Sequence, residues 1–266
     1  MKKISVVLTI AILPLIVKSQ DLTLFEKQTF TRNGNTLFYR ILYPNGYNKS
    51  KAYPVFTFLH GSGERGNDNE SQLTHGGALF ANDSVRKTFP AIVIFPQCPN
   101  DSTWNYIRSR RDSTNQTGRT FDLSFSPSPT TPALLVKLLL DSLVATKKAD
   151  SNRMYIGGLS LGGFGTFDMI ERYPAFFAAA TPICGGGDLT MADRFAKNVS
   201  VWLFHGDADK SVDVNNSRRY YAELKKLGAD TRYNEYPGVE HNSWDNAFKE
   251  RELLPWVLSK TKNKTK

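Results

Sequence analysis

The sequence predicts a doubly wound α/β fold, with a mostly parallel sheet and helices on both of its faces. Short apolar runs rich in β-branched and aromatic residues recur along the chain, each followed by Gly, Pro or Asp, as expected of strands buried on both faces. Helical segments separate these runs, and strands that alternate with helices pair in parallel. The apolar runs cover residues 55–59, 91–95, 153–156 and 201–204.

An antiparallel hairpin is predicted ahead of the parallel strands. Residues 24–31 and 37–42 are rich in strand-forming types, and the turn residues Asn33-Gly34-Asn35 separate them. The chain has 266 residues, of which 40% are hydrophobic, so it can bury one sizeable core. We therefore expect a single folded domain over residues 20–259.

Four helical segments lie between and after the apolar runs. In the first, Thr131 is expected to cap the helix and Pro132 to take its first position, where a missing N–H costs little. The third ends at Gly228, a common residue just past a helix. The segments cover residues 132–146, 162–172, 214–227 and a stretch after Trp244.

One connection, residues 106–131, is long for a compact domain and is polar, basic and rich in Ser, Thr and Pro. We interpret it as a flexible excursion from the domain. A lid that contacts substrate is the alternative.

The first 19 residues have the pattern of a secretory signal peptide. Lys2 and Lys3 precede an apolar run, residues 4–17, which ends near the small residue Ser19. A membrane anchor is the alternative, but this run contains Pro14 and is shorter than the roughly 20 residues that span a bilayer. The sequence thus predicts a secreted or periplasmic protein with no stable membrane insertion after cleavage.

The net charge of +9 is concentrated at the two ends of the chain. Removing the three lysines of the leader and the four of the last seven residues leaves the body near +2. A near-neutral body argues against a nucleic-acid partner, and residues 260–266 are expected to form a basic, disordered tail. Cys98 and Cys184 follow different predicted strands, and their spacing matches no metal motif. The sequence is therefore compatible with one disulfide and equally with two free thiols.

Chemistry is indicated by G-x-S-x-G at Gly158 to Gly162, between a predicted strand and a predicted helix. A turn this sharp needs glycines beside the serine, and it holds Ser160 above the sheet at a helix N-terminus, where developing negative charge is favoured. A tight turn with an idle serine is the alternative. In the strand–turn–helix context, Ser160 is predicted to be a nucleophile.

A serine nucleophile needs a base, which in this arrangement follows it along the chain, with an acid between them. Of four histidines, His60 and His75 come too early, and His205 ends a strand upstream of the acidic candidates. His241 remains, in a loop after the last strand, and is predicted to be the base.

The acid that orients His241 must follow the strand at 201–204. Asp207, Asp209 and Asp213 all do so. Asp209 is preferred, because Asp207 is close enough to the strand end to stabilise the turn, and Asp213 is expected to face solvent.

An oxyanion needs two backbone donors. The N–H of Leu161 is one candidate, and the N–H of Ser62 is the other, with Gly61 as its alternative. Gly61 and Ser62 belong to a run of small residues that follows the strand at 55–59 and lets the backbone approach a substrate.

Several stretches of the chain together match a known group of proteins: residues 53–66, 95–99 with Trp104, 158–163, 182–188, 205–209, 236–238 and 241–244. With these stretches the chain resembles secreted serine esterases of the polyhydroxybutyrate depolymerase and feruloyl or acetylxylan esterase type, with phospholipase/carboxylesterase and dienelactone-hydrolase relatives. The resemblance implies the α/β-hydrolase fold, Asp209 as the acid, an acyl-enzyme, no metal and no organic cofactor. Two features depart from the pattern: Val212-Asp213 stands where relatives commonly have Val-Pro, and residues 106–131 are longer than usual.

The resemblance further implies a substrate that is a small-molecule or polysaccharide ester, with acyl or feruloyl groups as candidates. Trp104 and Trp244 are candidate substrate-binding residues. One alternative is a small exported serine peptidase of the prolyl-oligopeptidase type, although the chain has no room for a gating domain. Another is an inactive carbohydrate-binding homologue in which the two tryptophans stack on sugar rings.

Overall fold

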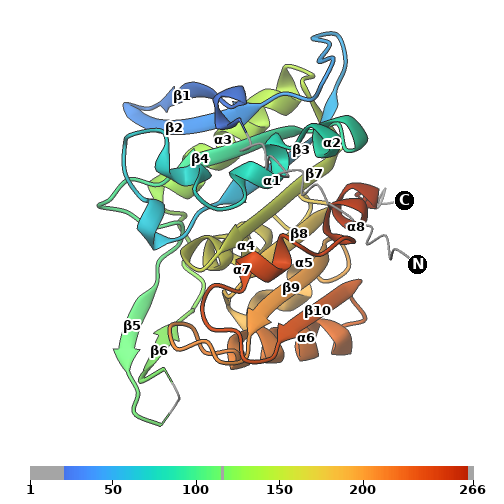
Figure 1. Ribbon diagram of the computed structural model, residues 1–266. Coiled ribbons are helices and arrows are strands. Elements are labelled where there is room, and N and C mark those ends of the chain that lie inside the picture. Colours follow the sequence, from blue (N-terminus) through green and yellow to red (C-terminus); the bar gives the residue numbers. More distant parts are fainter. Residues whose placement is uncertain (1–20, 115–116, 263–266) are drawn as a thin grey trace, which may run out of the picture.

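A computed structural model describes residues 21–114 and 117–262 of the chain (Figure 1). An eight-stranded sheet runs through the molecule in the order β1-β2-β4-β3-β7-β8-β9-β10. The six strands β4, β3, β7, β8, β9 and β10 pair in parallel with their neighbours in this order. Strands β1 and β2 form an antiparallel hairpin, and β2 pairs with β4 antiparallel. The strands are β1 (Glu26–Arg32), β2 (Asn35–Leu42), β3 (Tyr53–Leu59), β4 (Ile92–Gln97), β7 (Ala149–Leu159), β8 (Ala179–Ile183), β9 (Ser200–Gly206) and β10 (Thr231–Tyr236).

Helices cover both faces of this sheet, as Figure 1 shows. Successive residues of β4 point to opposite faces. Ile92 and Ile94 belong to the hydrophobic cluster that contains residues of α3, α4, α5 and α6, while Val93 and Phe95 belong to the cluster that contains residues of α1, α2, α7 and α8. The predicted fold class is therefore confirmed. The helices are α1 (Gly77–Ala81), α2 (Asp83–Thr88), α3 (Thr131–Ala145), α4 (Leu161–Arg172), α5 (Ala192–Phe195), α6 (Asn215–Lys226), α7 (Trp244–Ala247) and α8 (Leu253–Ser259).

The start of α3 lies one residue earlier than expected. The side chain of Thr130, not Thr131, accepts a hydrogen bond from the N–H of Ala133 and caps the helix. Thr131 is already helical, and Pro132 is the second helical residue. Proline is still tolerated there, because several N–H groups of the first helical turn, and not only the first, have no intrahelical acceptor.

The long connection contains regular structure, which the sequence analysis did not predict. β5 (Arg108–Arg111) and β6 (Arg119–Asp122) form a two-stranded antiparallel hairpin that projects from the body (Figure 1). The ring of Phe121 packs against Phe164 of α4, with centroids 5.2 Å apart. This contact with the buried helix holds the base of the hairpin against the domain.

Several expectations concern the ends of the chain and the cysteines. The signal peptide expected at residues 1–19 lies outside the described residues, as do the last four residues of the basic tail. The tail begins in an ordered way, because Lys260 Nζ lies 2.6 Å from Asp230 Oδ2 and the N–H of Lys262 donates to Asn152. Cys98 and Cys184 are both buried free thiols.

In the described part of the chain, no helix combines the length and the apolar composition that a membrane crossing requires.

Helix α4 buries an acidic residue that makes stability depend on pH. Glu171 is 2% exposed and accepts hydrogen bonds from Tyr220 Oη at 2.6 Å and from the N–H of Asp188 at 2.9 Å. Removal from water disfavours the carboxylate and raises the pKa of Glu171 to about 8. The folded protein therefore holds a proton here that the unfolded chain releases at lower pH.

Glu171→Gln is expected to become more stable relative to the wild type as pH rises from about 5 to 8. Between the unfolded and the folded pKa the wild type loses about 1.4 kcal/mol of unfolding free energy per pH unit through this group, and the variant does not. Urea unfolding of both proteins across this pH range measures the difference. Glu252→Gln, at an exposed position, is the control, and a difference for Glu171→Gln that stays constant with pH would contradict the expectation.

Candidate active site

Ser160 occupies the turn between β7 and α4 and has an unusual backbone conformation. Its φ is 51° and its ψ is −115°, a region that a residue with a side chain rarely adopts. The surrounding chain holds it there, since the N–H of Ser160 donates to Ile183 and its carbonyl accepts from Phe164. Strain of this kind persists where neighbouring structure overdetermines the backbone, and it is concentrated at functional sites.

The two glycines of the motif allow the turn to pack against β3. A Cβ atom on Gly162 would lie 1.9 Å from the carbonyl oxygen of Leu59, and one on Gly158 would lie 2.3 Å from the carbonyl oxygen of Gly162. Both distances are far inside van der Waals contact. The sequence therefore reaches this close approach only with glycine at both positions.

The structure brings together the three residues singled out from the sequence, although they lie far apart along the chain. His241 Nε2 is 2.9 Å from Ser160 Oγ, and His241 Nδ1 is 2.7 Å from Asp209 Oδ2. An ionised carboxylate only accepts hydrogen bonds, so Nδ1 carries the proton and Nε2 presents its lone pair to the serine hydroxyl. In this arrangement the imidazole can take the hydroxyl proton.

Asp209 is fully buried and is held by more than His241. Its Oδ1 accepts hydrogen bonds from the N–H groups of Ser211 at 2.7 Å and Val212 at 2.9 Å. Burial by itself would raise the pKa of Asp209, but hydrogen bonds from His205, His241 and Val212 outweigh it and hold the pKa well below the usual range. The carboxylate thus stays ionised beside the imidazole.

That carboxylate acts in turn on His241. Burial by itself would lower the pKa of His241, but the hydrogen bond with Asp209 outweighs it and raises the pKa above its ordinary value. Stabilisation of the imidazolium is what a histidine needs to accept a proton from a serine hydroxyl.

His205 contacts the same carboxylate, which sequence reasoning did not anticipate. It is fully buried, with Nε2 3.3 Å from Asp209 Oδ2 and 3.1 Å from the carbonyl oxygen of Val212. A carbonyl only accepts, so Nε2 carries the proton, and the hydroxyl of Ser217 donates to Nδ1 at 2.7 Å. The sequence offered one signal for this contact, because His205 and Asp209 lie close together directly after the predicted strand at 201–204.

The other two acidic candidates have structural positions. Asp207 Oδ1 accepts from the N–H of Gly238 at 2.7 Å, which ties the loop after β9 to the loop that carries His241. Asp213 is partly exposed, and its side chain accepts a hydrogen bond from the N–H of Asn215 at the start of α6. A helix start leaves N–H groups to be capped, which accounts for its position.

The candidate backbone donors lie next to Ser160. Leu161 is the first residue of α4, where the N–H has no intrahelical acceptor. Ser62 lines the same pocket as Ser160 and His241, and a Cβ atom on Gly61 would lie 3.7 Å from Ser160 Cβ. The loop after β3 therefore lies next to the nucleophile, as the start of α4 does.

His60 and Trp104 hold this loop from beneath. His60 Nε2 accepts from the N–H of Cys98 at 2.9 Å, and burial lowers the pKa of His60 to about 4, so the ring is neutral. Trp104 is fully buried and its Nε1 donates to the carbonyl of His60 at 3.0 Å. The expectation that Trp104 binds substrate is therefore wrong, because a buried indole that closes the core has no face left for a ligand.

Trp244 lies beside the site instead of under it. It is half-buried, and its ring meets His241 edge-on with centroids 5.4 Å apart and contacts His75 at 5.0 Å. Trp244 thus packs against the imidazole that faces Ser160.

A pocket of about 410 Å³ opens over Ser160 and His241. Its walls are largely apolar and come from six stretches of the chain. They include both strands of the hairpin, so the inserted segment lies at the site, as its alternative interpretation as a lid required. The lining residues outside the hairpin are Ser62, Thr103, Ser160, Leu161, Phe164, Ser211, Val212 and His241, and those of the hairpin region are Ile107, Ser109, Arg119 and Phe121.

One group of possible metal ligands occurs among the described residues. Side-chain atoms of Cys184, Asp209 and His241 lie within 4.8 Å of one another. Asp209 and His241 already bond each other, so a cation placed here would compete with the contact that orients the imidazole.

Comparisons with known proteins agree with this geometry. The profile of a family described as Phospholipase/Carboxylesterase matches residues 47–252. A solved structure of a thermostable esterase is 34% identical, with a TM-score of 0.78, and the match covers 90% of this chain and 64% of that chain. Poly(3-hydroxyalkanoate) depolymerase C of Paucimonas lemoignei is 34% identical over 91 residues, which are 33% of this chain and 22% of that protein.

A more distant solved structure shares the fold alone. A ferulic acid esterase of Anaeromyces mucronatus, in complex with ferulic acid, is 14% identical with a TM-score of 0.62, and the match covers 89% of this chain and 90% of that chain. The chain thus spans less than two thirds of the thermostable esterase and about a fifth of the depolymerase.

Proposed function

The chain belongs to the phospholipase/carboxylesterase family and has the α/β-hydrolase fold, and from this premise we propose that it is a serine hydrolase of carboxylic esters. The observation that carries the proposal is the chain of hydrogen bonds from Ser160 Oγ through the His241 ring to Asp209, at 2.9 Å and 2.7 Å. A hydroxyl, a base and an orienting carboxylate in this order are the parts that acyl transfer to serine requires.

In the first half of the reaction, Ser160 Oγ attacks the ester carbonyl while His241 Nε2 takes the hydroxyl proton. The imidazolium that forms is stabilised by Asp209 and then gives its proton to the departing alkoxide. The bond between the carbonyl carbon and the alcohol oxygen breaks, and the acyl group stays on Ser160. Water activated by His241 then repeats the sequence and releases the acid.

The negative charge on the former carbonyl oxygen needs donors that are in place beforehand. The N–H groups of Leu161 and Ser62 are our candidates, with Gly61 as the alternative to Ser62. Support comes from their position next to Ser160, one at the start of α4 and one in the loop after β3.

We further propose that the substrate is an ester outside the cytoplasm, with acyl or feruloyl groups of polysaccharide as the leading class. The signal-peptide pattern of residues 1–19 supports export, with residues 20–259 as the catalytic domain. Phe121, Phe164 and Ile107 give the pocket an apolar wall that suits an acyl group.

Labelling by a fluorophosphonate tests the proposal. We expect one label per chain, located on Ser160 by mass spectrometry, and labelling at least about 100-fold slower in His241→Ala, because the hydroxyl is a poor nucleophile without its base. Parallel assays with acetyl, feruloyl, longer-acyl and peptide-anilide substrates identify the kind of bond that the enzyme hydrolyses. Label on another residue, or faster turnover of the peptide anilide than of every ester, would contradict an esterase.

A further inference from the structure

The hairpin that lines the pocket has two faces with different charge patterns. In its register Arg108 lies opposite Asp122, Ser109 opposite Phe121, and Arg111 opposite Arg119. Side chains that lie opposite each other in an antiparallel pair share a face, and successive residues alternate between faces. Ser109, Arg111, Arg119 and Phe121 therefore form one face, and Arg108, Arg110 and Asp122 belong to the other.

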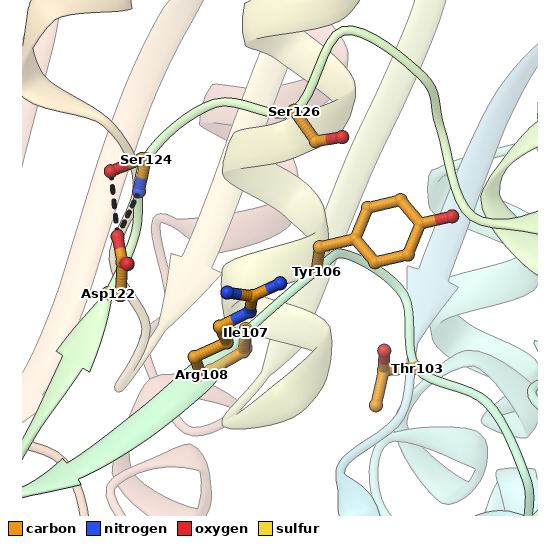
Figure 2. Close-up of a pocket in the computed structure, with 7 residues that line it drawn as sticks. All are labelled: Thr103, Tyr106, Ile107, Arg108, Asp122, Ser124 and Ser126. Carbon is orange, nitrogen blue, oxygen red and sulfur yellow. Dashed lines mark hydrogen bonds between the residues drawn. The ribbon is translucent and has the colours of Figure 1, made fainter.

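On the outer face, one acidic group lies beside two arginines. Arg110 Nη2 lies 3.2 Å from Asp122 Oδ2. The same carboxylate accepts hydrogen bonds from the N–H and the hydroxyl of Ser124, which Figure 2 shows. This face looks onto a second pocket of about 470 Å³, which Tyr106 and Arg108 also line. An acid of the same face thus offsets part of the positive charge of its two arginines.

On the pocket face, two arginines lie directly opposite each other and no residue of that face is acidic. Like charges in opposite positions of a strand pair repel each other, so this face presents a concentrated positive charge.

Arg119 also lines the pocket over Ser160. Among the described residues that line it, Arg119 is the permanently charged one, and none carries a carboxylate. A guanidinium binds a carboxylate through two parallel hydrogen bonds, and a positive group in a cleft raises the local concentration of anions.

We propose that Arg119, supported by Arg111 across the hairpin, binds a carboxylate of the substrate, so that the enzyme prefers esters with a negative group a few atoms from the scissile bond. The proposal rests on the proposed function, because it places the ester carbonyl at Ser160. It also assigns a role to the inserted segment, which brings a positive charge to a wall that is otherwise apolar and uncharged apart from His241.

Matched substrate pairs test the proposal on either side of the ester. Mono-4-nitrophenyl glutarate and 4-nitrophenyl valerate differ by a carboxylate in place of a methyl group on the acyl side. On the alcohol side, 4-acetoxybenzoate and 4-acetoxybenzamide differ by a carboxylate in place of a neutral carboxamide. We expect kcat/KM of the wild type to favour the anionic member of at least one pair by about fivefold, the range of a partly exposed ion pair.

Variants on the two faces of the hairpin distinguish binding of the carboxylate in the pocket from long-range attraction by the positive charge of the hairpin. Arg119→Gln is expected to reduce the ratio of kcat/KM between the anionic and the neutral member of a pair to near unity, and Arg119→Glu to reverse the preference. Arg110→Gln removes the same charge from the outer face of the same hairpin and should leave most of the preference intact. Raising the NaCl concentration to 0.5 M should weaken the wild-type preference, because salt screens exposed charges.

A ratio that Arg119→Gln leaves unchanged in both pairs, while Ser160→Ala abolishes turnover of the neutral esters, would overturn this inference and leave the esterase proposal standing. Binding gives a measurement that needs no turnover. Monomethyl glutarate should show saturation-transfer NMR signals with Ser160→Ala that are lost with Ser160→Ala/Arg119→Gln. Equal signals from both proteins would count against the carboxylate site whatever reaction the enzyme catalyses.

Discussion

Replacing Ser160 by alanine is expected to lower kcat for 4-nitrophenyl acetate by about 10⁴-fold or more. Without the hydroxyl no acyl-enzyme forms, and only stabilisation of the oxyanion and substrate positioning remain, as in other serine hydrolases that lose their nucleophile. Steady-state assays of the purified variant, with release of nitrophenolate as the signal, measure the loss.

The control for this substitution is Ser142→Ala on α3, where the hydroxyl donates to the carbonyl of Leu139 within the helix. This variant removes the same atom away from the pocket and should keep its activity. Circular dichroism and thermal unfolding of both variants exclude misfolding as the cause. Activity of Ser160→Ala above about 1% of the wild type would assign the chemistry to another group, since a lost nucleophile leaves far less.

The second large effect is expected from Asp209→Asn, which should lower kcat by about 10³- to 10⁴-fold. The amide can donate to His241 Nδ1, which favours the tautomer with the proton on Nε2 and leaves no lone pair for Ser160. The backbone N–H groups of Ser211 and Val212 can still hold the amide oxygen, so the geometry should survive.

The same variant should change the pH profile in a defined direction. The carboxylate raises the pKa of His241, so its removal lowers that pKa. Because the base is active when neutral, residual kcat/KM of Asp209→Asn should persist to lower pH than that of the wild type. A pH–rate profile of both proteins measures the shift, and an acid limb that moves to higher pH would contradict the assignment.

Two matched variants test the choice of acid. Asp207→Asn and Asp213→Asn remove the same charge from the same loop, but their side chains accept from the backbone N–H groups of Gly238 and Asn215 and do not contact His241. We expect each to lower kcat by less than about tenfold, the loss that a modest displacement of the loop would cause. A loss in either variant as large as that in Asp209→Asn would move the acid to that residue.

Strands were recognised from the sequence where both of their faces are buried by large apolar side chains. The four apolar runs correspond to β3, β4, β7 and β9, whose residues pack against helices on the two sides of the sheet. β8 and β10 were not among those runs. β8 consists mainly of small residues, and β10 is a polar edge strand that is only partly buried, so neither has the composition of a doubly buried strand.

The turn at Ser160 was also accessible from the sequence, because its requirements are local. Glycines at 158 and 162 are needed where backbone atoms approach within about 2 Å of a Cβ position, and a strand before and a helix after them are legible from composition. The order of nucleophile, acid and base along the chain pointed to His241, and the structure places its ring within hydrogen-bonding distance of Ser160.

The sequence by itself determined the fold class, the turn that presents Ser160 and a short set of partners, because these depend on periodicity, turn chemistry and chain order. Only the tertiary structure decided the surroundings: that Trp104 closes the core, that His205 holds Asp209, and that the hairpin brings Arg119 over the nucleophile. Each of these contacts depends on how separate elements pack together or how the chain turns back on itself, and such packing produces no periodic pattern in the sequence.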